Sequence, residues 1–82
     1  MDLDFLLERN GKFLVQEFKP EGVRPGIGQG RTLRALRSFA DVWVVYGDGP
    51  VVQVDFGDGD LHAMTTEEYE DETVLWFEEA SK

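Results

Sequence analysis

The sequence predicts one α/β domain, residues 1–82, with a mixed central sheet that begins in an N-terminal β-hairpin. Asn10-Gly11 separates two strand-like segments and gives the strongest short hairpin signal. Residues 41–46 (DVWVVY) form a continuous apolar, β-branched run, which is typical of a strand covered on both faces. Thr65 and Glu68 have capping-box spacing and predict a helix over about 66–80.

The hairpin spans about residues 2–19, and its two-residue turn fixes the strand register. In that register Leu7 faces Leu14 and Asp4 faces Glu17. Because side chains alternate along a strand, Asp4, Glu17 and Lys19 share one face near the open end of the hairpin. Asp2 falls on the same face, either as a third acid of a site or as part of the chain terminus.

A Gly- and Pro-rich loop follows Lys19, and a helix is expected from about Gln29 or Arg31 to Phe39. Residues 51–56 alternate like a strand with one buried side, and residues 60–64 are expected to form a short last strand. The apolar stripe of the first helix is Leu33, Leu36, Phe39 and Ala40, and that of the C-terminal helix is Tyr69, Thr73, Trp76 and Ala80.

Composition narrows the chemistry that the chain can perform. With no cysteine and only His62, the sequence excludes disulfides, thiolate zinc sites, cysteine nucleophiles and two-imidazole sites. We expect His62 to be structural, and we expect the DFGDGD run at 55–60 to form acidic turns, because it lacks the spacing of a calcium loop. No apolar run is long enough to span a membrane and no basic leader is visible, which favours a cytoplasmic protein.

Charge is unevenly distributed along a chain whose formal net charge is −9. Residues 19–41 hold five bases against two acids, whereas residues 42–82 hold eleven acids against one base. The negative net charge opposes binding to a polyanion such as nucleic acid, whereas the basic segment at residues 19–41 favours it. The bases of that segment are Lys19, Arg24, Arg31, Arg34 and Arg37.

Several of these features occur in one order along the first half of the chain. Asp4 is followed by Glu17-Phe18-Lys19 at the end of the next strand, then by Gly28-Gln29 at the start of a helix, then by the strand VWVVYG. Over residues 2–47 this order resembles the PD-(D/E)XK nuclease superfamily, in particular its small phage and VRR-NUC type. The resemblance implies a restriction-endonuclease-like minimal core and an enzyme that hydrolyses phosphodiesters of DNA, with RNA not excluded.

The residue types suit that chemistry. Phosphodiester hydrolysis needs an activated water and neutralisation of the charge that develops on the phosphate, and hard cations such as Mg²⁺ or Mn²⁺ prefer carboxylate oxygens. Asp4 and Glu17 are the expected metal ligands, and the resemblance adds the backbone carbonyl of Phe18. It also implies that Lys19 orients the water and that Gln29 positions the lysine, the water or a phosphate. Phosphate contacts are expected from Arg24, Arg31, Arg34 and Arg37.

Plainer alternatives remain open at this point. Asp4, Glu17 and Lys19 could form an ordinary solvated face, the glycines around Gln29 could serve loop geometry alone, and the arginines could be a solvated helix face. The acidic second half of the chain also resembles DNA-mimicking inhibitors in composition, which gives a second function class. A catalytically silent assembly subunit is a third function class.

The chain departs from the family pattern because the usual opening helix and first strand are missing. Either the C-terminal strands and acidic helix fill those places, which could bring Glu67 or Glu68 to the metal, or a second copy covers the exposed surface. Exposed Trp43 and Trp76 are the expected sites of such a homodimer, and a recruiting protein partner is also open.

Overall fold

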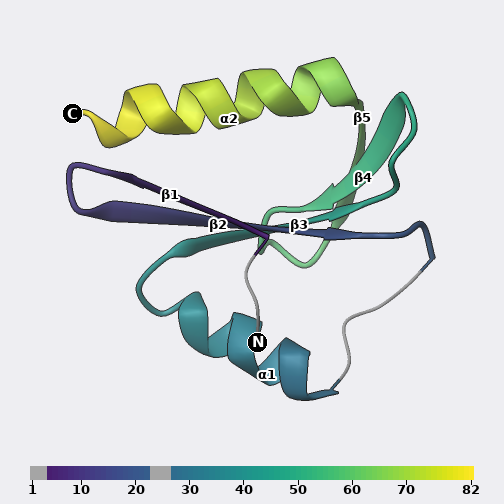
Figure 1. Cartoon of the computed structure of the whole chain (residues 1–82), viewed down its shortest axis with the longest axis horizontal. Helices are drawn as coiled ribbons and strands as arrows, with labels where there is room; N and C mark the ends of the chain where they lie inside the picture. Colours follow the sequence, from purple (N-terminus) through teal and green to yellow (C-terminus); the bar gives the residue numbers. More distant parts are fainter. Residues whose placement is uncertain (1–3, 23–26) are drawn as a thin grey trace.

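The computed structural model describes residues 4–22 and 27–82, apart from the side chains of 27–29. It contains a five-stranded sheet in which spatial order follows chain order, together with two helices (Figure 1). The elements are β1 (Phe5–Arg9), β2 (Lys12–Lys19), α1 (Ile27–Leu36), β3 (Asp41–Tyr46), β4 (Val51–Asp55), β5 (Leu61–Thr65) and α2 (Thr66–Ala80). The β2–β3 pair is parallel and the other pairs are antiparallel, so the predicted mixed sheet is confirmed.

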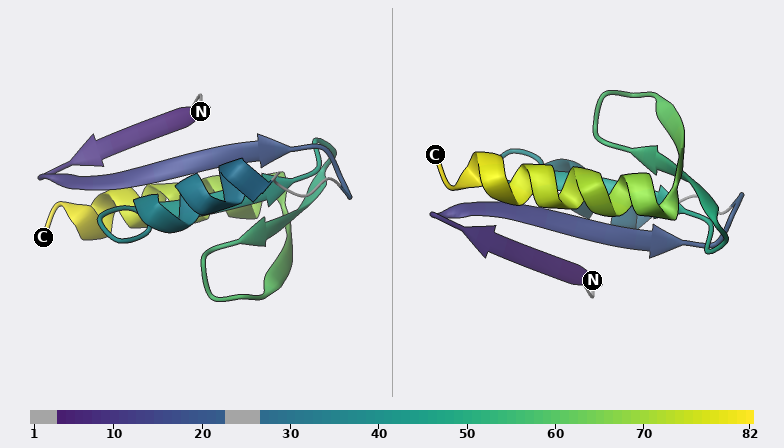
Figure 2. Two further views of the ribbon diagram at one scale, coloured as in Figure 1. Left: turned by 90° about the horizontal axis from the view of Figure 1, so that it is seen from below. Right: turned by 90° about the horizontal axis from the view of Figure 1, so that it is seen from above.

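The two helices lie on opposite faces of the sheet. Since parallel neighbours need a long crossover, the segment between β2 and β3 contains α1, which runs back beneath the sheet (Figure 1). The chain then passes through β4 and β5 and returns as α2 across the other side (Figure 2). We refer below to the α1 face and the α2 face of the sheet.

The hairpin forms as predicted. Asn10 and Gly11 both have positive φ, at 56° and 78°, as a tight two-residue turn requires. The register pairs Leu7 with Leu14 and Phe5 with Gln16, as expected from the turn length. The turn is further held by Glu8, whose Oε2 accepts a hydrogen bond from the Gly11 backbone N–H at 2.8 Å.

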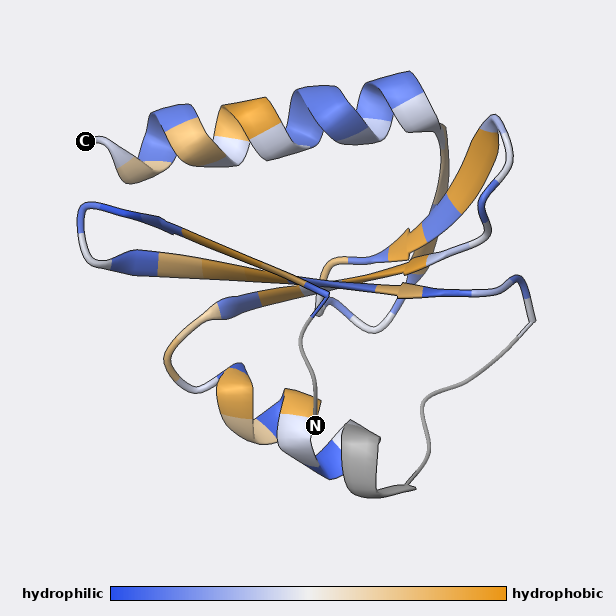
Figure 3. Cartoon of the chain, viewed as in Figure 1, coloured by the Kyte–Doolittle hydropathy of each residue, from blue (hydrophilic) through white to orange (hydrophobic). Residues whose placement is uncertain are grey.

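Each face of the sheet has its own apolar cluster, and β3 contributes to both. Residues 42–45 are all buried, which confirms the strand covered on two sides. Figure 3 shows hydrophobic stretches along the strands, while much of α2 is hydrophilic. The α2-face cluster is Leu14, Trp43, Val45, Val52, Val54 and Tyr69, and the α1-face cluster is Val15, Leu33, Val42 and Val44.

Helix α2 begins at the predicted capping box. The Thr65 hydroxyl accepts a hydrogen bond from the Glu68 backbone N–H at 3.0 Å, and Glu68 Oε1 accepts one from the Thr65 backbone N–H at 2.8 Å. Such a cap stabilises a helix by about 1 kcal/mol. The predicted inner stripe is also confirmed, since Tyr69 and Ala80 are buried and Thr73 and Trp76 are half-buried.

Buried polar groups fix where α2 rests on the sheet. Gln16 Nε2 lies 2.6 Å from the Tyr69 hydroxyl and 3.0 Å from Thr73 Oγ1. Burial raises the pKa of Tyr69 to about 12, so the hydroxyl stays protonated. At the other end of the contact, Trp76 Nε1 donates to Asp41 Oδ2 at 2.7 Å.

Three expectations about this packing are wrong. Helix α1 starts at Ile27 and ends at Leu36, and residues 37–39 form a turn that leaves Phe39 68 % exposed, outside the core stripe. Trp43 is only 8 % exposed because Phe56 and Tyr69 pack edge-on against it. Trp76 packs against the same cluster, so neither tryptophan offers the exposed surface that was expected to recruit a second copy.

Neither described helix combines the length and the apolar character needed to cross a lipid bilayer.

Candidate functional site

Asp4, Glu17 and Lys19 meet at the end of the hairpin away from its turn. Asp4 directly precedes β1, while Glu17 and Lys19 lie two residues apart on β2 and share its α1 face. The Asp4 Oδ2 atom accepts a hydrogen bond from the Phe18 backbone N–H at 2.8 Å, which holds the Asp4 carboxylate against β2. The hairpin therefore brings two acids and an ammonium together, as the turn length predicted.

Glu17 is the unusual member of this group because it is buried. Its exposed fraction is 2 %, although its neighbours on the same face are the apolar Val15 and, across the parallel pair, Val44. Burial and then the charge of Asp4 raise the pKa of Glu17, and the nearby Lys19 ammonium acts in the opposite direction. A carboxyl group placed in an apolar layer beside a second carboxylate is costly unless a cation compensates for it.

The donor set suits a hard divalent cation. Magnesium keeps several of its waters and is usually held by one or two carboxylates, so the Asp4–Glu17 pair is a sufficient protein contribution. Within residues 4–22 and 27–82 no group of three or more histidine, aspartate or glutamate side chains is arranged for a metal. Asp2, the other acid expected on this face, lies outside the described residues.

Helix α1 carries two of the four arginines that are predicted to contact phosphate, Arg31 and Arg34. Arg31 and Arg34 are exposed on the helix, and Gln29 lies in its first turn with a side chain that is not described. Arg24 lies outside the described residues. These positions put two exposed cations on the same side of the sheet as Glu17.

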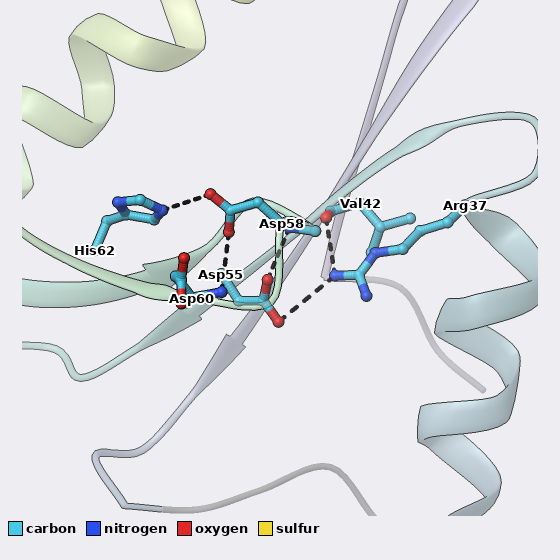
Figure 4. Close-up of polar contacts among 7 residues, drawn as sticks. Arg37, Val42, Asp55, Asp58, Asp60 and His62 are labelled. Carbon is cyan, nitrogen blue, oxygen red and sulfur yellow. Dashed lines mark hydrogen bonds and ion pairs between the residues drawn. The ribbon is translucent and has the colours of Figure 1, made fainter.

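Arg37 has a structural contact as well as a charge. Its Nη2 donates to the Val42 carbonyl at 3.3 Å and lies 3.8 Å from Asp55 Oδ2, so it joins the end of α1 to β3 and β4 (Figure 4). Part of its charge is thus compensated by Asp55, and Arg31 and Arg34 are better placed for phosphate contacts.

A groove on the α1 face runs from the carboxyl ends of β2 and β3 towards β5. Arg34 and Arg37 line it from the α1 side, and Asp48, Asp55 and Asp60 line it from the loops and β4. Because one wall is basic and the other acidic, a phosphate would be accepted only along α1.

Tyr46 was not predicted from the sequence to lie beside the candidate site. It ends β3, lines this groove, and is paired in parallel register with Lys19. The adjacency depends on the pairing of two strands that are separated by a whole helix. Only the position of Tyr46 at the end of an apolar strand could have hinted at it.

The acidic 55–60 segment forms turns, as predicted. Asp55 Oδ1 accepts from the Gly57 N–H at 2.7 Å, and Asp58 Oδ1 accepts from the Asp60 N–H at 3.1 Å (Figure 4). His62 Nε2 lies 2.7 Å from Asp58 Oδ2, and this hydrogen bond lowers the pKa of Asp58. The contact ties β5 to the turn that precedes it, which agrees with a structural role for His62.

The suggestion that Glu67 or Glu68 approaches the metal is wrong. Both residues lie in the first turn of α2, which packs on the face of the sheet opposite to Glu17. Glu68 is also engaged in the capping box.

Comparisons of this chain with models of protein families, with curated proteins and with solved structures find no match.

Proposed function

We propose that this protein is a divalent-metal-dependent nuclease that hydrolyses phosphodiesters of nucleic acid, with DNA as the first candidate substrate. The observation that carries the proposal is the buried Glu17 beside Asp4, with Lys19 on the same strand face. Structural ion pairs are normally exposed, and burying a carboxyl group next to another acid destabilises a domain of this size. Such an arrangement is typical of a site that binds a cation.

The residues then have distinct roles. Asp4 and Glu17 hold Mg²⁺ or Mn²⁺, and the resemblance to PD-(D/E)XK nucleases adds the carbonyl of Phe18. The bound cation supplies an activated water and neutralises developing phosphate charge. Lys19 donates hydrogen bonds through its Nζ, orients the attacking water and stabilises negative charge on the phosphate oxygens. Gln29 is a candidate for positioning the lysine or the phosphate.

The arginines position the substrate. Arg31 and Arg34 are exposed on α1, and we assign phosphate contacts to them first, with Arg24 and Arg37 as further candidates. Phosphate contacts of this kind fix the register of a nucleic acid without reading its sequence. A net charge of −9 makes such binding depend strongly on this local basic surface and on salt. A nuclease of this kind is also consistent with the cytoplasmic location that we expect.

A second candidate is an acidic mimic of DNA that binds a nucleic-acid-binding protein. The observation that favours it is the exposed acidic surface of α2. Its members are Glu67, Glu68, Glu70, Asp71, Glu72, Glu78 and Glu79. This candidate does not use Glu17, whose burial on the opposite face of the sheet it leaves unexplained.

The proposal is tested by incubating the purified protein with plasmid, single-stranded DNA and RNA in the presence of Mg²⁺ or Mn²⁺. We expect cleavage of at least one substrate, abolished by a chelator and restored by excess metal. If all three substrates stay intact with either metal, and the protein instead inhibits a DNA-binding enzyme, the mimic replaces the nuclease.

A further inference from the structure

Strand β1 forms one edge of the sheet. In the part of the chain that the structure describes, β1 pairs only with β2, so its outward backbone groups are available to another strand. Edge strands are normally shielded by charges, proline, a bulge or a covering loop, because an open apolar edge promotes pairing with other chains. Strand β1 instead begins with three apolar residues in succession, Phe5, Leu6 and Leu7.

Phe5 and Leu6 are exposed, one on each face of the sheet, whereas Leu7 packs against the α2-face cluster. Phe5 is 58 % exposed on the α2 face, and Leu6 is 53 % exposed on the α1 face. The side chains of Phe13 and Phe18 are also about 40 % exposed. The Phe18 ring packs edge-on against the Phe5 ring, with 5.8 Å between the ring centres. On a strongly acidic chain, an apolar edge of this kind marks a contact surface.

The opposite edge of the sheet differs. Strand β5 also exposes an apolar residue, Leu61, but it follows the acidic turn that contains Asp58 and Asp60 and leads directly into α2. In an antiparallel pairing of two β5 strands, the acidic turn of one copy would lie beside the acidic first turn of α2, with Glu67 and Glu68, of the other copy. At the β1 edge the described acids are Glu8 within the strand and Asp4 directly before it, and the register of the pairing decides whether they face each other.

We propose that the β1 edge pairs with the β1 edge of a second copy of this chain, antiparallel and centred on Leu7. In that register, Phe5 lies opposite Arg9 of the partner subunit and Leu6 lies opposite Glu8 of the partner subunit. Shifting the centre to Leu6 would place Asp4 opposite Glu8 of the partner subunit, and like charges directly opposite each other are destabilising.

An existing contact supports this choice of register. The Arg9 guanidinium lies 4.2 Å from the centre of the Phe77 ring. The proposed pairing brings Phe5 of the partner subunit to the other side of the same guanidinium, which extends one cation–π contact into two. The two-fold symmetry repeats both cross-strand pairs, so each favourable or unfavourable pair counts twice.

The test is sedimentation equilibrium over a dilution series, with three variants. The wild-type chain is expected to approach twice its 9.3 kDa mass as concentration rises. Leu6→Glu places a glutamate opposite Glu8 of the partner subunit, whereas Leu6→Lys removes the same apolar side chain but places a lysine there. With two such pairs per dimer, we expect Leu6→Glu to raise the dissociation constant at least about tenfold relative to Leu6→Lys.

Leu61→Glu is the matched control, because Leu61 is 57 % exposed on the other edge strand and the change alters net charge equally. It should dimerise like the wild type. A wild-type chain that stays monomeric overturns the proposal. So does equal dissociation of the Leu6→Glu and Leu6→Lys variants, or an effect of Leu61→Glu as large as that of Leu6→Glu.

Discussion

Replacing Lys19 with alanine is expected to lower the cleavage rate by at least about 100-fold, which is the usual contribution of a positioned group of this type. The Lys19 side chain lies on the same strand face as Asp4 and Glu17, and Lys19 belongs to neither apolar cluster of the sheet. Removing it should therefore leave the fold and the metal affinity largely intact. The measurement is single-turnover DNA cleavage at saturating Mg²⁺, accompanied by thermal unfolding of the same sample.

Lys12→Ala provides the control for this variant. Lys12 begins the same strand next to the hairpin turn, is exposed, and changes the net charge by the same amount when it is replaced. Its variant should cleave at the wild-type rate. Unchanged cleavage by Lys19→Ala, or equal losses in the two variants, would remove Lys19 from the mechanism.

Glu17→Gln is expected to lose metal binding and activity while gaining stability at neutral pH. Loss of even an outer-shell partner costs metal affinity about 10- to 100-fold, so loss of a direct carboxylate should cost about 100-fold or more. The gain in stability follows from the burial of the Glu17 carboxyl group beside Asp4. A neutral amide avoids both the desolvation of the charge and its repulsion from Asp4.

The pH dependence of stability separates this explanation from a general packing effect. The pKa of Glu17 is raised in the folded state from an ordinary value of 4.5, so the folded state binds this proton more tightly than the unfolded chain does. The contribution of Glu17 to the free energy of unfolding is therefore full below that value. It is lost as the pH rises through the raised pKa, and it stays lost above it.

Urea unfolding of wild type and Glu17→Gln, compared from mildly acidic to neutral pH without metal, measures this difference. We expect the free energy of unfolding of the variant to exceed that of the wild type by more and more as the pH rises. In a second series with Mg²⁺, we expect the metal to stabilise the wild type but not the variant. A variant that is less stable at every pH would show that the carboxylate of Glu17 is a structural group.

The parts of the fold that the sequence predicts are those set by neighbouring residues. Asn10-Gly11 determined the turn and hence the pairing of Leu7 with Leu14, and the capping box of Thr65 and Glu68 located the start of α2. The continuous apolar run at residues 42–45 predicted a strand buried on both faces without any information about the segments that cover it. Each of these predictions depends on short-range geometry alone.

The errors concern contacts between distant segments. Trp43 is covered by Phe56 and Tyr69, and Arg37 reaches Asp55, but neither contact follows from a local pattern. Phe39 fitted the period of α1 but lies beyond the end of the helix, where it is exposed.

Some features of the candidate site likewise follow from local sequence, and others depend on contacts between distant segments. The proximity of Asp4 to Glu17 follows from the hairpin register, and the structure agrees, since Asp4 contacts the Phe18 N–H. The burial of Glu17 depends on α1 packing over that face of the sheet and on β3 pairing beside β2, and the pairing of Lys19 with Tyr46 depends on a parallel crossover. These two tertiary features distinguish the site from an ordinary hairpin face, and neither could be obtained from spacing.

The most direct test of the proposed metal site is a titration with Mg²⁺ monitored by backbone amide chemical shifts. The Phe18 N–H donates to Asp4 Oδ2, so it should report directly on a cation bound by that carboxylate. We expect saturable shifts centred on Asp4, Glu17 and Phe18, absent from Glu17→Gln. Shifts confined to the exposed acids of α2, or equal responses in the wild type and the variant, would contradict the metal site and with it the proposed nuclease.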